Sequence, residues 1–191
     1  KFLDIGCSAG PYVKYFPNRL GVDVKKTAAV DVVADAHDLR MFNDEEFDGV
    51  LCTEVLEHLH TPAQAISEMR RVLKKDGLLL LTTRFIFPLH DAPGDYYRFT
   101  RYGLEYLLRD FKIIELREEA GTITTLAVLL QRIGWQCETL DFKPLRIIWL
   151  ILARITQLFS PFITTEYGDI KHQQQVKQIM TSGYYVACKK I

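Results

Sequence analysis

Two kinds of hydrophobic pattern alternate along the first two-thirds of the chain. Short apolar runs predict β-strands at residues 2–5, 19–24, 30–34, 47–52, 78–83 and 111–116, with helical candidates between them. The run from Leu78 to Leu81 contains no polar position, which is typical of a strand covered on both faces. This alternation predicts an α/β fold with a parallel, doubly wound sheet.

Residues 62–74 carry the clearest helical pattern. Their apolar positions recur at helical spacing and form one stripe: Ala65, Ile66, Met69, Val72 and Leu73. Thr61 is the expected N-cap, Pro62 suits the first helical position, and Gly77 is the expected stop signal. We therefore expect a helix packed against the sheet here.

The last third of the chain departs from this alternation. Residues 122–175 read as a helical insertion, and strand composition returns only at residues 184–189. Within the insertion, residues 144–163 predict an amphipathic helix with an apolar side made of Ile147, Ile148, Ile151, Leu152, Ile155, Leu158, Phe159 and Phe162. The opposite side carries Lys143, Arg146, Arg154 and Gln157.

The two arginines within residues 144–163 argue against a membrane span, because each would be costly in the middle of a bilayer. Three roles stay open for this amphipathic helix. It could be a lid packed on the domain, the contact face of a homodimer, or a segment that lies on a membrane surface. We also expect the insertion to cover the acceptor site, and its apolar face to favour a greasy acceptor.

Length and charge narrow the class of protein. A chain of 191 residues suits one α/β domain and is short for two, so we expect a single domain over residues 1–191. Lys plus Arg equals Asp plus Glu at 24 each, so no overall positive field favours nucleic acid. The expected partner is a small or neutral acceptor, with no nucleic acid.

The cysteines and the first residues bear on location. The four cysteines form no CxxC pair and no zinc-spaced cluster: Cys7, Cys52, Cys137 and Cys188. We expect reduced thiols in a cytoplasmic protein, with three of them packed as small hydrophobes. The chain opens inside a strand, without Met and without a signal-peptide pattern, so we expect an upstream segment to be missing or disordered.

A glycine-rich turn follows the first strand. Asp4 ends that strand, and Gly6 and Gly10 allow a tight turn whose backbone amides can approach a ligand. The spacing differs from the GxGxxG of dinucleotide sites. A carboxylate at Asp4 suits the ammonium group of an amino-acid-like ligand better than it suits a pyrophosphate.

Two further carboxylates end the next two predicted strands. Asp23 follows the second strand, where nucleotide-binding α/β folds place a carboxylate that accepts ribose hydroxyls. Asp35 follows the third strand, where it can accept from an adenine amino group. Three carboxylates at the ends of successive strands predict a ligand with both a nucleoside part and an amino-acid part.

The motifs also resemble a known family. In order, they are residues 3–10, 21–23, 35–36, 46–50, 54–59 and 73–77. They resemble the motifs of class I S-adenosylmethionine-dependent methyltransferases of the "type 11" kind, over residues 1–119 and again at 184–189. The resemblance implies a Rossmann-like seven-stranded sheet of order 3-2-1-4-5-7-6, with the last strand antiparallel, and S-adenosyl-L-methionine as the cofactor.

The same resemblance implies the cofactor-binding residues, which are Asp4, Gly6, Cys7, Ser8, Gly10, Asp23, Val24, Asp35, Ala36 and Thr53. The turn after the first strand would wrap the methionine part, Asp23 would hold the ribose, and Asp35 would border the adenine. Thr53 would lie beside the sulfonium. Ser8 stands where the family usually has glycine, so it needs a permitted backbone angle.

Glu54, Glu57 and His58 stand at i, i+3 and i+4 of an expected short helix, a spacing that stacks them on one face. The string also resembles methyltransferases of the ubiquinone pathway, in which such residues are associated with a divalent metal. A structural His58 is a second alternative. We predict no metal here and a catalytic His58 that contacts the substrate.

The loop at residues 87–100 follows the fifth strand, on the edge where open α/β sheets bind ligands. It resembles a loop of bacterial methyltransferases often linked to glycan or cell-envelope pathways. The predicted substrate contacts are Asp95, Tyr96 and Arg98, although Arg98 and Asp95 could simply pair with each other. Thr100 is the expected N-cap of a helix at residues 101–109.

These features predict methyl transfer to a small molecule, or to a glycan or lipid intermediate, at an oxygen or nitrogen atom. An oxygen acceptor benefits from a nearby base, and His58 and His90 are the candidates. The alternative is a non-catalytic cofactor-fold protein that binds or acts as a scaffold. We expect a cytoplasmic protein, or one peripheral to the inner membrane face.

Overall fold

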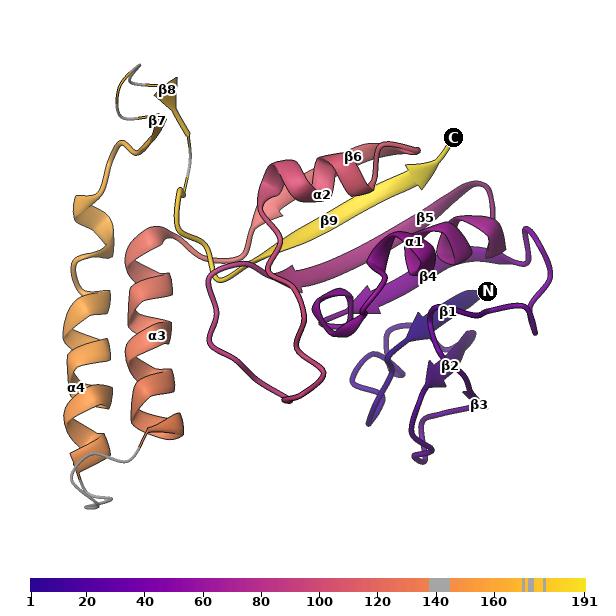
Figure 1. The fold of residues 1–191 in the computed structure, drawn as a ribbon, viewed down its shortest axis with the longest axis horizontal. Helices are drawn as coiled ribbons and strands as arrows, with labels where there is room; N and C mark the ends of the chain where they lie inside the picture. The colour runs from indigo at the N-terminus through magenta and orange to yellow at the C-terminus, as the bar shows by residue number, and fades with distance from the viewer. Residues whose placement is uncertain (138–144, 170, 172–173, 177) are drawn as a thin grey trace. The chain divides into compact units, whose positions relative to one another are not determined.

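The computed structural model describes residues 1–191 except 138–144, 170, 172–173 and 177 (Figure 1). It divides into two compact units. The sheet unit comprises Lys1–Arg84, His90–Arg117 and Tyr184–Ile191, and the hairpin unit comprises Phe85–Leu89 and Glu118–Gly183. The expectation of a single domain over residues 1–191 stays a prediction.

Seven strands form the main sheet: β1 (Phe2–Ile5), β2 (Arg19–Asp23), β3 (Val32–Val33), β4 (Phe47–Thr53), β5 (Leu73–Arg84), β6 (Phe111–Glu118) and β9 (Gly183–Lys190). Their order is β3-β2-β1-β4-β5-β9-β6. The pairs from β3 to β5 are parallel, whereas β9 runs opposite to β5 in Figure 1. Because β9 is the seventh strand of this sheet, the predicted order is confirmed.

Strand lengths differ from the sequence prediction at two places. Strand β3 keeps two residues of the predicted five. Strand β5 begins at Leu73, which pairs with Phe47 before the register shifts. Gly77 therefore lies inside β5, where a Cβ would lie 2.8 Å from the carbonyl oxygen of Lys74. The expected helix stop at Gly77 was wrong.

Helices in the sheet unit follow β4 and β5: the short 3-10 helix η1 (Leu56–His58), α1 (Pro62–Val72) and α2 (Arg101–Leu107). Helix α1 buries its predicted apolar stripe. Thr100 Oγ1 accepts from the amide of Gly103 at 3.1 Å, so the predicted cap is confirmed. Thr61 occupies the cap position of α1, but its hydroxyl contacts His60 Nδ1 at 2.8 Å instead of capping the helix.

No helix forms in residues 6–18 or 24–46, where the alternating pattern led us to expect helices. Residues 6–18 are turns, because Pro11 and Pro17 lack amide donors and Gly6 and Gly10 adopt positive φ. The chain between β1 and β2 is consequently a loop that lies open to ligands.

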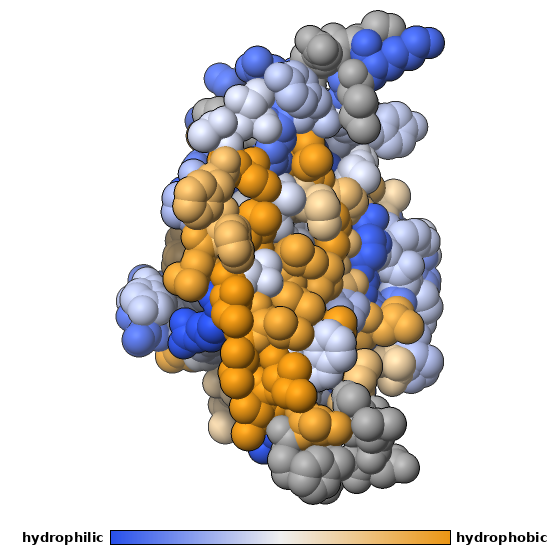
Figure 2. All heavy atoms as spheres, turned by 90° about the vertical axis from the view of Figure 1, so that its left-hand side faces the viewer, coloured by the Kyte–Doolittle hydropathy of each residue, from blue (hydrophilic) through white to orange (hydrophobic). Residues whose placement is uncertain are grey.

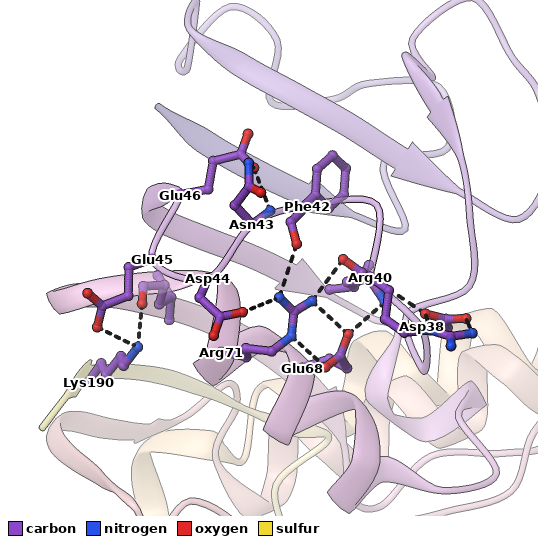
Figure 3. A network of polar contacts seen from close by, with 12 residues as sticks. Asp38, Arg40, Phe42, Asn43, Asp44, Glu45, Glu46, Glu68, Arg71 and Lys190 are labelled. Atoms are coloured by element: carbon purple, nitrogen blue, oxygen red, sulfur yellow. Dashed lines mark hydrogen bonds and ion pairs between the residues drawn. The ribbon is translucent and has the colours of Figure 1, made fainter.

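Arg71 on α1 anchors the loop that leads into β4 (Figure 3). Its guanidinium donates to both carboxylate oxygens of Glu68, to Asp44 Oδ1 at 2.7 Å, and to the carbonyl oxygens of Leu39 and Phe42. The planar guanidinium has five N–H donors, so it can supply hydrogen bonds to loop carbonyl oxygens that have no partner in a regular helix or sheet.

The hairpin unit contains α3 (Thr122–Gln136), α4 (Arg146–Gln157), the 3-10 helix η3 (Ser160–Phe162), and a two-stranded sheet of β7 (Tyr167–Asp169) and β8 (Gln174–Gln175). The helical insertion is thus confirmed for its first part, whereas its end forms strands. Lys143, assigned from sequence to the polar side of the amphipathic helix, lies outside the described residues. No described helix is long and apolar enough to cross a bilayer.

Candidate functional site

The turn after β1 has a backbone that glycine makes possible. Gly6 has φ +70°, and a Cβ there would lie 2.1 Å from Val55 Cγ2. Gly10 has φ +72°, and a Cβ there would lie 2.7 Å from Ala29 Cβ. Ser8 adopts φ +44°, so it has the left-handed backbone that its position was expected to need.

Asp23 at the end of β2 holds this turn in place. Its Oδ2 accepts from the amide of Ser8 at 2.9 Å, and its Oδ1 accepts from the amide of Lys25 at 3.0 Å. A carboxylate oxygen has more than one acceptor site, so both oxygens can still accept from a ligand hydroxyl.

Asp4 at the end of β1 is a buried anion beside the same turn. Its side chain is 1% exposed, and neither oxygen accepts a hydrogen bond from the described residues. Arg19 Nη1 lies 3.5 Å from Asp4 Oδ2. Burial raises the pKa of Asp4, Arg19 opposes the rise, and Asp23 adds to it. A ligand cation placed here would stabilise the charged carboxylate.

Two cavities meet over the carboxyl ends of β1 and β2. The larger, about 650 Å³, is lined by Asp4, Gly6, Cys7, Ser8, Pro11, Tyr12, Asp23, Val24, Lys25, Thr53, Glu54, Val55, His58, Asp91 and Gly94. The smaller, about 230 Å³, is lined by Ile5, Gly6, Val22, Asp23, Val24, Ala34, Asp35, Ala36, His37, Val55, His58, Leu59, His60, Gly94 and Tyr96. Together they have the size of a cofactor site.

Asp35 in the smaller cavity is held by a histidine that the sequence did not single out. His37 Nδ1 lies 2.6 Å from Asp35 Oδ1, and His37 Nε2 accepts from the amide of Thr61 at 3.2 Å. Nε2 is therefore unprotonated, and Nδ1 carries the proton that it donates to Asp35. Burial raises the pKa of Asp35, but the hydrogen bonds from His37 outweigh it and lower the pKa.

His60 completes this wall of the smaller cavity. Its ring stacks on His37 with centroids 4.1 Å apart and meets the ring of Tyr96 edge-on at 6.3 Å. Three separate segments supply His37, His60 and Tyr96, so the spacing of these residues in the sequence did not predict that they would meet.

The segment after β4 departs from the one-faced helix expected for Glu54, Glu57 and His58. Glu54 precedes the 3-10 helix in the left-handed region, with φ +56°. Its carboxylate accepts from Thr82 Oγ1 at 2.9 Å and forms an ion pair with Arg84. The three residues therefore do not share a face, because the helix starts too late to include Glu54.

Glu57 and His58 are instead joined by His90 from the following loop. Glu57 is fully buried, accepts from Thr83 Oγ1 at 2.8 Å through Oε2, and places Oε1 3.9 Å from His90 Nε2. One ligand atom from each of Glu57, His58 and His90 lies within 4.8 Å of the others. This set could hold a divalent cation, although no metal was predicted.

His58 has a defined tautomer. Its Nδ1 lies 2.7 Å from the carbonyl oxygen of Gly94, which can only accept, so Nδ1 carries the proton. The other ring nitrogen, Nε2, then keeps a lone pair. Because His58 lines both cavities, it can accept a proton from a molecule bound there.

The loop after β5 is fastened by an ion pair. Arg98 donates to Asp95 Oδ1 at 2.6 Å and to Oδ2 at 2.7 Å, and the amide of His90 donates to Oδ2 at 2.9 Å. The pairing with Arg98 holds the pKa of Asp95 well below its usual range. The Arg98–Asp95 pair considered from sequence is therefore confirmed.

Comparison with known proteins shows what this sequence and fold are similar to. Residues 3–81 match the family model described as "Methyltransferase domain". A ubiquinone biosynthesis O-methyltransferase of Alkalilimnicola ehrlichii is 30% identical over 129 residues, covering 57% of this chain and 49% of that protein. The sequence and the fold are thus similar to those of class I S-adenosylmethionine-dependent methyltransferases. It spans about half the length of the curated relatives it matches.

Solved structures share the methyltransferase fold at low identity. The 1,6-didemethyltoxoflavin-N1-methyltransferase of Burkholderia thailandensis, with bound 1,6-didemethyltoxoflavin and S-adenosylhomocysteine, has a TM-score of 0.57 at 16% identity, covering 99% of this chain and 70% of that one. The [4+2]-cyclase SpnF has a TM-score of 0.58 at 18% identity, covering 99% and 73%. Because a cyclase has the same fold, the fold alone does not assign an activity.

The residues predicted for this candidate site fall into two groups. Nine of the ten predicted cofactor residues line the two cavities; Gly10 lines neither and serves the turn. Of the other predicted residues, His58 and Tyr96 line a cavity, whereas His90, Asp95 and Arg98 line neither and hold the loop through hydrogen bonds. Their catalytic and substrate roles stay predictions.

Proposed function

We propose that this chain transfers a methyl group from S-adenosyl-L-methionine to a hydroxyl of a small molecule, or of a glycan or lipid intermediate. The proposal rests on the position of His58. Its Nδ1 donates to the carbonyl oxygen of Gly94, and its ring lines the cavities that Asp4, Asp23 and Asp35 also line. A base and a cofactor site with three carboxylates thus share one space.

The residues present fit this cofactor. Asp4 is a buried carboxylate with no hydrogen-bond donor among the described residues, as expected for a group that pairs with the ligand's ammonium. Asp23 can accept from ribose hydroxyls, and the free oxygen of Asp35 can accept from the adenine amino group. When bound, S-adenosyl-L-methionine supplies a methyl group that is already activated by its sulfonium.

The rest of the chemistry belongs to the chain. The residues around the cavities hold the acceptor and exclude water, and Nε2 of His58 takes the proton of the acceptor hydroxyl. An oxygen acceptor is favoured over an amine because it needs such a base. The similarity to an O-methyltransferase of the ubiquinone pathway supports the same choice.

The test is a methyl-transfer screen with labelled S-adenosyl-L-methionine across phenolic, glycan and lipid-linked hydroxyl compounds, run beside calorimetric titration of the cofactor. We expect binding at micromolar concentration and label in at least one hydroxyl class. Label only in amines would overturn the hydroxyl assignment. Binding without transfer to any class would favour the non-catalytic alternative, and no binding would reject the proposal.

A further inference from the structure

Helices α3 and α4 of the hairpin unit bury small residues and expose large apolar ones. Helices of proteins in water usually show the reverse arrangement. The buried residues of α3 and α4 are small: Thr125, Ala127, Gly134 and Ala153. At Gly134 a Cβ would lie 3.1 Å from Trp149 Cβ, so the two backbones approach closely there. Small residues at a helix contact are typical of helices whose large side chains face an apolar medium.

The large apolar side chains of α4 and the segment after it point outward instead. Each exposes between 40% and 77% of its surface: Ile147, Ile148, Ile151, Leu152, Ile155, Leu158, Phe159, Phe162 and Ile163. Figure 2 shows them gathered into one continuous patch, which we name the α4 patch. A contiguous apolar surface of this kind marks an interaction site.

The charge around the α4 patch distinguishes a lipid surface from a second copy of the chain as the molecule that covers it. The described residues 122–136 and 145–165 contain three arginines and no acidic residue. Arg146 and Arg154 are exposed, and Arg146 lies over the ring of Trp135 at 5.2 Å. A second copy pairing through the same face would bring the same arginines and, from these described residues, no carboxylate to meet them. Anionic lipid headgroups would supply that negative charge.

We propose that the α4 patch docks on the surface of an anionic lipid bilayer, with Ile, Leu and Phe side chains in the headgroup and acyl boundary and the arginines at the phosphates. Helix α4 has 12 residues, about 18 Å, against a hydrocarbon core of roughly 30 Å, so it lies along the surface. This inference concerns the hairpin unit and does not depend on the methyl-transfer reaction.

Intrinsic fluorescence can read this docking directly. The chain has two tryptophans, Trp135 on α3 and Trp149 on α4, so the emission of the full chain reports on this hairpin. We expect a blue shift with vesicles of phosphatidylcholine containing about one third phosphatidylglycerol, and quenching when the acyl chains are brominated. Vesicles of phosphatidylcholine alone should give a weaker response.

Two results would overturn the proposal. Unchanged emission and no flotation with either vesicle would mean that the α4 patch does not meet lipid. A blue shift that grows with protein concentration, resists brominated lipid and accompanies a dimer in light scattering would assign the patch to a second copy.

Matched variants locate the contact. Ile151→Asp should weaken partitioning into anionic vesicles at least about tenfold, whereas Ile114→Asp, the same change at an exposed position of β6, should leave it unaltered. Arg154→Gln should weaken it about fivefold on anionic vesicles only. Leu158→Asp, at a side chain that is 71% exposed, gives a second apolar test if Ile151→Asp fails to fold.

The melting temperature and binding of S-adenosyl-L-methionine, a property of the sheet unit, serve as folding controls for each variant. Folded Ile151→Asp and Leu158→Asp variants that both bind vesicles like the parent chain would contradict the proposal.

Discussion

The carboxylate of Asp23 accepts a hydrogen bond from the backbone amide of Ser8 at 2.9 Å, and this contact ties the end of β2 to the turn after β1. The turn contains two glycines and a serine with positive φ, and it has no helix of its own. The residue proposed to hold the ribose therefore also fixes the backbone proposed to wrap the methionine.

Asp23→Ala removes both contributions at once. We expect the affinity for S-adenosyl-L-methionine to fall by about 1–3 kcal/mol, the usual cost of losing a hydrogen bond to a charged group. Calorimetric titration measures it. Asp38→Ala is the matched control, because Asp38 pairs with Arg40 on the surface and lines neither of the two cavities. Equal affinities in the two variants would refute the ribose assignment.

Asp4→Asn should separate stability from binding. Burial raises the pKa of Asp4, so the folded chain holds this proton more tightly than the unfolded chain. The contribution of Asp4 to the free energy of unfolding is therefore greatest below the ordinary pKa of an aspartate, and it falls as pH rises through the raised pKa. Asparagine has no such proton, so the variant does not lose stability in this way.

We expect Asp4→Asn to melt at a higher temperature than the parent chain at neutral pH without ligand, and to bind S-adenosyl-L-methionine about 1–3 kcal/mol more weakly. Melting curves across a pH series and calorimetry check both parts. A lower melting temperature at neutral pH would show that Arg19 compensates the buried charge fully.

His58→Asn keeps a donor for the carbonyl oxygen of Gly94 but removes the base. We expect kcat to fall by about 10²–10⁴, with the KM for S-adenosyl-L-methionine changed only a fewfold. His90→Asn is the control, and a larger loss of kcat there than in His58→Asn would transfer the role of base to His90.

Arg71→Met should destabilise the chain by about 2–3 kcal/mol, because it removes the guanidinium that donates to Glu68, to Asp44 and to two loop carbonyl oxygens. Denaturant unfolding followed by circular dichroism measures the change. Arg40→Met serves as the control: its side chain is 84% exposed, and we expect its unfolding midpoint to stay where it is. Similar midpoints in both variants would mean that the loop is held by other contacts.

Periodicity and strand-end chemistry were sufficient for much of the fold. The apolar runs identified all seven strands of the main sheet, and the stripe of α1 identified its buried face, because burial on a sheet leaves a repeat that one sequence displays. The carboxylates Asp4, Asp23 and Asp35 were found because parallel strands end at one edge. The sequence pattern predicted helices in residues 6–18 and 24–46, but none forms there, since local turn geometry overrode the expected alternation.

The sequence by itself determined the resemblance to methyltransferases, the order of the sheet and most of the residues around the two cavities. Only the tertiary structure decided which side chains act as partners: His37 on Asp35, His90 beside Glu57, and Gly94 on His58. Those contacts join residues up to 36 positions apart. A hydrogen bond forms only when the distance between donor and acceptor is correct to within a few tenths of an ångström, and no spacing along the chain encodes that distance.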